Sequence, residues 1–105
     1  MSDILTRLEA TIASRRGADA KSSYVASLFA KGRPKIARKL GEEAVEAIVA
    51  SLAEDQAALT GEAADVIFHL LILLADAGVP LADVLAELER REGVSGHDEK
   101  AARPA

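Results

Sequence analysis

Residues 34–53 have the sequence PKIARKLGEEAVEAIVASLA, and residues 56–77 have the sequence QAALTGEAADVIFHLLILLADA. Both segments are rich in Ala, the first also has three Glu and the second five Leu, and neither contains a proline after position 34, which favours α-helix. At about 100° of rotation per residue, each helix is apolar over most of its circumference. Such helices must be covered on more than one side. The two segments therefore predict an all-α, four-helix-bundle-like core that is completed by dimerisation.

Glycine, proline, serine and aspartate divide the chain into helical units. Each boundary uses a residue with a known capping preference: Ser or Asp before a helix, Pro in its first turn, and Gly after its end. The expected boundary residues are Ser22 or Ser23, Gly32, Pro34, Asp55, Gly78 and Pro80. The chain is therefore predicted to form about five helices in one domain, residues 1–92, followed by a polar, disordered tail, residues 93–105.

Composition excludes several classes of protein. The chain has 105 residues and no cysteine, so it has neither a disulfide framework nor a thiolate zinc site. Its start, Met-Ser-Asp-Ile-Leu, lacks the basic and apolar regions of a signal peptide, and we expect a cytoplasmic protein. The longest apolar run, residues 70–75, is too short to span a bilayer, so no membrane is expected.

Charge is distributed unevenly along the chain. Residues 1–40 contain nine Lys or Arg and three acids, whereas residues 41–105 contain four Lys or Arg and fourteen acids. A basic arm beside an acidic body suits a polyphosphate substrate bound with a divalent cation. Nucleic acid is disfavoured as a partner, because only Tyr24 and Phe29 are aromatics near the basic residues and the acidic body would repel a duplex.

The acidic body contains two carboxylate motifs on the two long helices. They are Glu42-Glu43-x-x-Glu46 and Glu62-x-x-Asp65, in a stretch without Lys or Arg. Each motif falls on one flank of its helix, so an antiparallel pair could face them towards each other. Packed carboxylates repel unless a hard cation neutralises them, which makes Glu43, Glu46, Glu62 and Asp65 candidate metal ligands. The alternative is that both motifs are ordinary solvated helix faces.

Other residues near these motifs also have two interpretations. The basic residues Lys31, Arg33, Lys35, Arg38 and Lys39 either contact phosphate or form a plain helix surface. His69 is either a hydrogen-bonded core residue or a ligand. Gly41 and Gly61 precede the two acidic motifs, where either something approaches the backbone closely or the glycines are merely tolerated.

Several motifs together resemble the phosphoribosyl-ATP pyrophosphatase family of histidine biosynthesis. They are Ser23-Tyr24-Val25-Ala26, Lys31-Gly32, Lys35-Ile36-x-x-Lys39-x-Gly41-Glu42-Glu43-Ala44-x-Glu46 and Glu62-Ala63-Ala64-Asp65-x-x-x-His69-Leu70-Leu71. The resemblance runs from about residue 4 to residue 91. It also places the chain in the wider MazG-like superfamily of all-α nucleotide pyrophosphohydrolases. Phe68 departs from the Tyr expected there, and the cyclohydrolase domain sometimes fused to these enzymes is absent, which implies a stand-alone form.

The resemblance implies Mg²⁺-dependent hydrolysis of phosphoribosyl-ATP to phosphoribosyl-AMP and pyrophosphate, with Mn²⁺ as a possible substitute. Glu43, Glu46, Glu62 and Asp65 would then hold the metal, and Glu42 would be a further ligand or a base that orients water. Catalysis would thus depend on Glu42, Glu43 and Glu46. Phosphate oxygens would contact the basic side chains Lys31, Arg33, Lys35 and Lys39, and Tyr24 would pack on the base or ribose.

Three other functions remain as alternatives. A MazG-like enzyme of the same fold could act on another nucleoside triphosphate. A di-iron bundle is disfavoured, because it needs Glu-x-x-His on two helices and here Asp65 and His69 are four residues apart. The third alternative is a non-catalytic helical dimerisation module.

Overall fold

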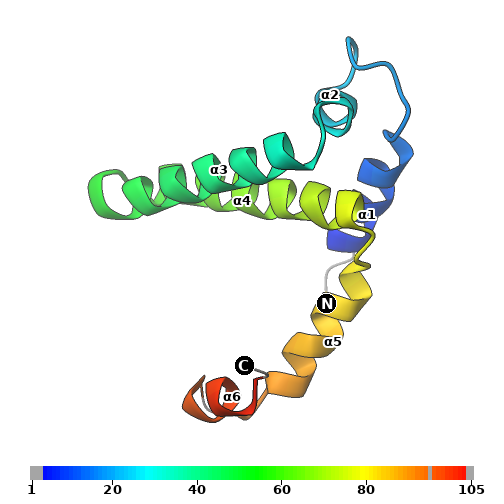
Figure 1. The fold of residues 1–105 in the computed structure, drawn as a ribbon. Helices are drawn as coiled ribbons and strands as arrows, with labels where there is room; N and C mark the ends of the chain where they lie inside the picture. The colour runs from blue at the N-terminus through cyan, green and yellow to red at the C-terminus, as the bar shows by residue number, and fades with distance from the viewer. Residues whose placement is uncertain (1–3, 95, 104–105) are drawn as a thin grey trace.

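The computed structural model describes residues 4–94 and 96–103. Within these ranges the chain forms six α-helices and no β-strand, which confirms the all-α prediction. The helices are α1 (Ile4–Ser14), α2 (Tyr24–Lys31), α3 (Arg33–Ala53), α4 (Gln56–Ala77), α5 (Leu81–Arg91) and α6 (Gly96–Ala102). The long helices α3 and α4 lie side by side and antiparallel, α1 and α2 gather at one end of this pair, and α5 leads away from it (Figure 1).

Local capping interactions set the helix boundaries where the sequence predicts them. The Ser23 hydroxyl accepts a hydrogen bond from the Ala26 amide at 3.1 Å and begins α2. The Asp55 carboxylate accepts one from the Ala58 amide at 2.8 Å and begins α4. Gly78 ends α4 with a φ of 73°, in the left-handed region that favours glycine.

Gly32 ends one helix and begins the next. Its amide donates to the carbonyls of Leu28 and Phe29 in α2, and its own carbonyl accepts from the Ile36 amide in α3. Its φ of 92° is one that other residues rarely adopt. A single residue therefore joins α2, which ends in Lys31, to the helix that carries the first acidic motif.

The core lies where the first five helices meet. Every one of these helices contributes at least one buried apolar side chain to it, so no helix pair forms a core alone. The buried residues of this cluster are Ile12, Val25, Leu28, Ile36, Leu71, Ile72 and Leu81. The Glu9 carboxylate of α1 accepts a hydrogen bond at 2.7 Å from the Leu81 amide. It thereby caps the start of α5, because the preceding residue, Pro80, has no side-chain acceptor for this amide.

The C-terminal segment differs from the prediction of a disordered tail. Helix α6, Gly96–Ala102, lies within residues 93–105. Its sequence GHDEKAA contains several good helix formers, and these local preferences account for the short helix. Residues 95 and 104–105 of the predicted tail lie outside the described residues, and the domain boundary itself stays a prediction.

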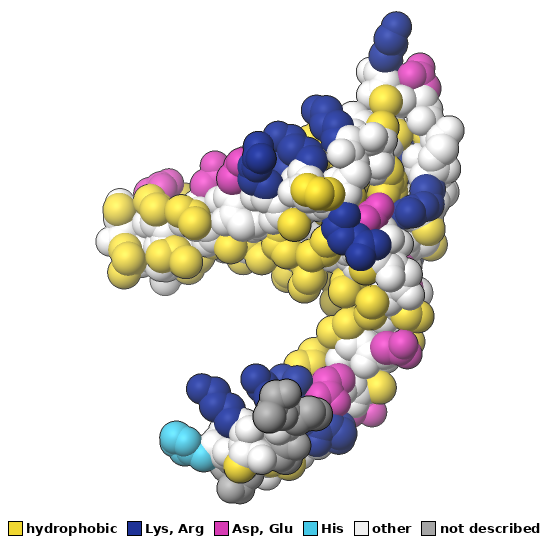
Figure 2. All heavy atoms as spheres, viewed as in Figure 1, with side chains coloured by type: hydrophobic (Ala, Val, Ile, Leu, Met, Phe, Trp, Pro, Cys, Tyr) yellow, Lys and Arg dark blue, Asp and Glu magenta, His cyan; other side chains and the backbone are white. Residues whose placement is uncertain are grey.

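Many apolar side chains along the α3/α4 pair are exposed. They are Val45, Ile48, Val49, Leu52, Ile67 and Leu70, and Leu52 is 83% exposed. The radius of gyration is 15.7 Å, compared with about 13 Å for a compact domain of this length. The chain thus leaves part of its apolar surface uncovered, as Figure 2 shows along the α3/α4 pair.

Helix α4 is long and apolar enough, by length and composition alone, to cross a membrane. Its 22 residues include a window with a mean hydropathy of 1.7, although the longest uninterrupted apolar run had predicted no span. The core helix of a soluble protein can meet the same criterion of length and composition. In α4 the apolar surface is interrupted by Glu62, Asp65 and Asp76 on one flank.

Candidate metal and substrate site

Three carboxylates from α3 and α4 converge in the middle of the helix pair. Glu43, Glu62 and Asp65 each place one oxygen so that all three oxygens lie within 4.8 Å of one another. Glu43 is buried, with 8% of its surface exposed, Glu62 is half-buried and Asp65 is exposed. The antiparallel packing of α3 against α4 therefore brings together acids that lie about twenty residues apart in sequence.

The surroundings of the Glu62 side chain indicate whether this cluster suits a metal ion. Its Oε2 atom is buried and has no hydrogen-bond partner among the described residues. An unpaired buried carboxylate oxygen is costly, and two further carboxylates beside it raise that cost. An oxygen-preferring divalent cation such as Mg²⁺ or Mn²⁺ would satisfy all three groups, so the donor set fits such an ion.

Glu46 borders this cluster but is not part of the closest group. Its pKa is raised above the ordinary value, first because its carboxyl shares a hydrogen bond with Glu43 and is repelled by that charge. Burial and the neighbouring Glu62 act in the same direction. Of the four predicted ligands, the structure thus gathers three tightly and places the fourth beside two of them.

Lys39 is the cation nearest to the acidic cluster. Its ammonium lies 3.5 Å from Oε1 of Glu43 and 3.6 Å from Oε1 of Glu42. Glu42 is otherwise solvent-exposed, with half of its side chain accessible. The structure therefore places Glu42 on the rim and Lys39 at the junction between the basic and acidic surfaces.

The other predicted lysine ligands lie on the neighbouring helices α2 and α3. Lys31 ends α2, Lys35 is in the first turn of α3, and neither forms an ion pair within the described residues. Figure 2 shows Lys and Arg side chains gathered beside acidic ones above the α3/α4 pair. An open groove of about 610 Å³, lined by residues 41, 42, 45 and 46, adjoins the acidic motif.

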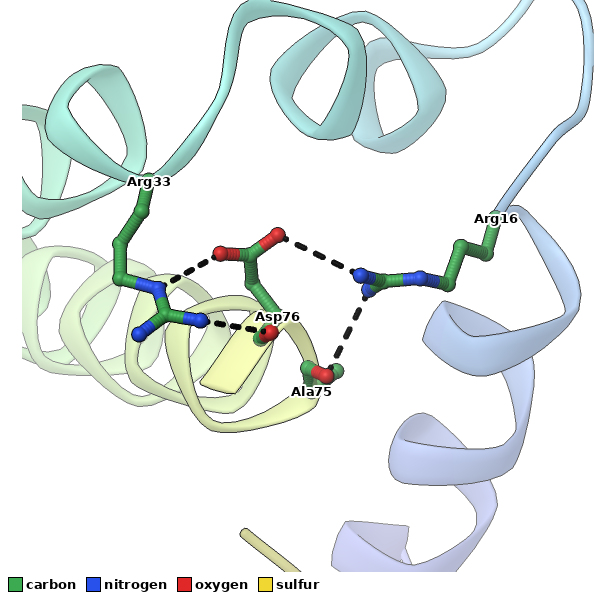
Figure 3. A network of polar contacts seen from close by, with 4 residues as sticks. All are labelled: Arg16, Arg33, Ala75 and Asp76. Atoms are coloured by element: carbon green, nitrogen blue, oxygen red, sulfur yellow. Dashed lines mark hydrogen bonds and ion pairs between the residues drawn. The ribbon is translucent and has the colours of Figure 1, made fainter. Parts of the chain in front are cut away.

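Arg33, predicted to contact substrate, is engaged by α4. Its Nε donates to the Asp76 carboxylate at 2.8 Å, and its Nη2 donates to the Asp76 carbonyl at 3.0 Å (Figure 3). Arg16 approaches the other carboxylate oxygen at 3.5 Å, and its guanidinium also lies over the ring of Phe29. This network ties α3, α4 and the segment after α1 together. It occupies two of the donor groups of Arg33.

Tyr24 and His69 form a contact that the sequence did not predict. The Tyr24 hydroxyl lies 2.7 Å from Nε2 of His69, and Nδ1 of His69 lies 2.7 Å from the main-chain oxygen of Asp65. The only sequence signal was that His69 falls one turn after Asp65, on the same helix flank. A partner 45 residues away could not be inferred from it.

Comparison with known proteins identifies the family of the chain. Residues 5–92 match the family described as phosphoribosyl-ATP pyrophosphohydrolase. The chain belongs to this family. The match covers both acidic motifs, the basic residues of α2 and α3, and the Tyr24–His69 pair, which confirms the resemblance seen in the sequence.

Relatives of the phosphoribosyl-ATP pyrophosphohydrolase family align with nearly the whole chain. A protein named phosphoribosyl-ATP pyrophosphatase from Rhizorhabdus wittichii is 67% identical, over 99% of this chain and 98% of its own length. Proteins of the same name from Dinoroseobacter shibae and Zymomonas mobilis are 63% and 57% identical, over 95% and 97% of this chain. They cover 98% and 95% of their own lengths.

Proposed function

We propose that this chain hydrolyses phosphoribosyl-ATP to phosphoribosyl-AMP and pyrophosphate, the second step of histidine biosynthesis. Membership of the phosphoribosyl-ATP pyrophosphohydrolase family supports the substrate. The observation that carries the chemistry is the convergence of Glu43, Glu62 and Asp65 within 4.8 Å, next to the Lys39 ammonium. Cleaving a phosphoanhydride requires charge neutralisation and an oriented water, and this surface offers groups for both.

The acidic residues provide the metal and water functions. Glu43, Glu46, Glu62 and Asp65 would hold Mg²⁺, or Mn²⁺ in its place, and Glu42 would bind or orient water from the rim. When bound, the ion would neutralise phosphate oxygens and polarise the bond that breaks. The raised pKa of Glu46 supports this assignment, because it reports how closely the carboxylates crowd one another without a cation.

The basic residues provide the substrate contacts. Lys35 and Lys39 follow one another on the flank of α3 that leads to the acids, and they would hold non-bridging phosphate oxygens. Lys31 would reach the phosphates from the end of α2, and Tyr24 would pack on the base or ribose. Arg33 would contribute its Nη1 group, which makes no hydrogen bond within the described residues.

Pyrophosphate release tests this proposal. Phosphoribosyl-ATP, ATP, dUTP and dCTP are each incubated with the purified chain, with and without Mg²⁺. We expect release from phosphoribosyl-ATP far above the other three, and only with the cation. Preferential release from ATP, dUTP or dCTP would instead favour another MazG-like activity. No release from any of them would favour a non-catalytic module.

We also propose that the chain works as a homodimer, in the cytoplasm, without nucleic-acid or membrane partners. The exposed apolar side chains of α3 and α4 and the extended shape support a second copy as their cover. Replacing one of them by an acid, Ile48→Glu, should give a monomer by size exclusion with light scattering, whereas Glu54→Gln should not. A wild-type monomer at micromolar concentration would refute the dimer.

A further inference from the structure

Helix α5 projects from the body of the molecule. Its first residue, Leu81, is buried in the core, and the amide of Leu81 donates to the Glu9 carboxylate at 2.7 Å. From this anchored base α5 leads away from the α3/α4 pair, and the surface between them is concave (Figures 1 and 2). Apolar side chains lie on both sides of this concave surface (Figure 2). The molecule therefore presents two apolar walls that its own chain does not bring together.

The apolar residues of α5 form one stripe that begins in the core and ends in solvent. At about 100° of rotation per residue, Leu81, Val84, Leu85 and Leu88 fall within about 100° of one another. Leu81 is 6% exposed and Leu85 still packs against the core, but Leu88 is 56% exposed. A helix in a folded protein is stabilised mainly by packing of its apolar face. The outer part of the α5 stripe therefore lacks the cover that its base has.

Two open hollows adjoin Leu88, with volumes of about 290 and 350 Å³. The first is lined by Val79, Asp83, Val84, Glu87, Leu88 and Arg91. The second is lined by Leu85, Leu88, Glu89, Arg91 and Glu92. The Glu87 carboxylate lies 2.7 Å from Nε of Arg90 and 3.1 Å from Nη2 of Arg91, so ion pairs border the stripe. An apolar centre with a polar rim and room for side chains is typical of a protein interface.

Helix α4 carries a second apolar stripe. Ala63, Ile67, Leu70 and Leu74 recur at intervals of three or four residues and therefore lie on one face of α4. Ile67 is 45% exposed and Leu70 is 38% exposed. Because α5 leads away from α4, these two stripes do not cover each other within one chain (Figure 1).

The accessible surface area indicates what could cover them. The chain exposes 7263 Å², whereas a compact monomer of 11.0 kDa exposes about 5,600 Å². The excess is about 1,600 Å² per copy, so two copies that covered it would bury about 3,200 Å² in total. Obligate homodimers bury about 2,000–5,000 Å². A second copy of the chain is therefore of the right size to cover the exposed apolar surface.

We propose that α5 is an exchanged arm, whose outer turns pack on the α4 stripe of a second copy of this chain. The α5 arm of the partner subunit makes the same contact in return. A twofold axis makes the two contacts identical, so each copy covers both stripes of the other without any further partner. The inference rests on the homodimer proposed above, and it does not depend on the substrate.

Leu88→Glu tests the arm by placing a charge in the proposed contact. Because the twofold axis puts this charge at two positions, we expect the dissociation constant of the dimer to rise at least about a hundredfold. The matched control, Ala86→Glu, adds the same side chain on the opposite, exposed face of α5 and should change that constant less than about threefold. Sedimentation velocity over a dilution series measures the constants, and circular dichroism shows that each variant is folded. An unchanged constant in Leu88→Glu, or equal losses in both variants, would overturn the proposal.

Contacts between subunits can also be measured without any substitution. In a dimer of one carbon-13-labelled and one unlabelled copy, isotope-filtered NOE spectra show only contacts between the two chains. We expect NOEs from the Leu88 methyl groups to Ile67 or Leu70 of the partner subunit, and none from the Ala86 methyl group. A dimer without NOEs at Leu88 would refute the exchanged arm alone, whereas a wild-type monomer would refute the homodimer as well. Pyrophosphate release tests the hydrolysis separately from both.

Discussion

Neutralising Glu62 should have opposite effects in the absence and in the presence of a divalent cation. Without metal, Glu62 adds a negative charge to a site that already contains Glu43 and Asp65 within 4.8 Å, and its Oε2 has no partner in the described chain. Glu62→Gln keeps the shape and removes the charge. The metal-free variant should therefore be more stable than the wild type, although a candidate ligand has been lost.

The size of the gain follows from the separation of the charges. Two carboxylates 4.8 Å apart repel by about 1 kcal/mol in water and by about 3.5 kcal/mol at an effective dielectric constant of 20. Asp65 is exposed, so the lower value suits the repulsion between Asp65 and Glu62. Glu43 is buried, so the repulsion between Glu43 and Glu62 is nearer the upper value. After allowance for screening, we expect a gain of about 1–3 kcal/mol, or a Tm at least about 4 °C higher.

Thermal unfolding at fixed protein concentration, with EDTA or with Mg²⁺, measures both effects. At ten times its Kd, Mg²⁺ should stabilise the wild type by about 1.4 kcal/mol, and it should stabilise Glu62→Gln much less. The matched control is Glu54→Gln, an exposed acid at the end of α3, which should change neither quantity appreciably. A lower Tm of the metal-free variant, or a wild type that does not respond to Mg²⁺, would refute the reasoning.

Three further predictions concern interactions outside the candidate site. Glu9→Ala removes the side-chain cap of α5 and should lower the free energy of unfolding by about 1 kcal/mol in urea titrations. Asp76→Asn weakens the ion pair with Arg33 and should cost about 2 kcal/mol in the same assay; a change below about 0.5 kcal/mol would contradict it. A hydrogen bond from Arg90 is the main reason that the pKa of Glu87 falls from 4.5 to about 2, so its stabilisation is present above pH 4.5 and is lost as the pH drops towards 2. In Glu87→Gln, unfolding followed by circular dichroism should show a flatter pH dependence over that range.

Features that depend on neighbouring residues could be predicted from the sequence. Ser23 and Asp55 begin helices and Gly78 ends one, because each cap is formed with residues only a few positions away. It was also predictable that Glu43 faces Glu62 and Asp65. Helix periodicity places the acids of each motif on one flank of its helix, and the short connection between α3 and α4 makes these two helices antiparallel. The same periodicity predicted that α3 and α4 leave apolar surface uncovered.

Features that depend on distant partners could not be predicted. Arg33 looked like a phosphate ligand because it lies among lysines, but Asp76, 43 residues further along, takes two of its donors. The pairing of Tyr24 with His69 is equally non-local. Periodicity also placed Glu46 on the same flank as Glu43, yet it could not show that Glu46 stays outside the closest group.

The single-residue joint at Gly32 has a consequence for how the enzyme can vary and move. Its amide and carbonyl are both held by hydrogen bonds, which restrains the torsions of the joint and disfavours a hinge there. The main-chain positions of Lys31 and Lys35 on either side should therefore keep a fixed spacing, while their flexible side chains adjust to the nucleotide. An insertion at this point would break that spacing, whereas the exposed connection of residues 15–22 should accept added length.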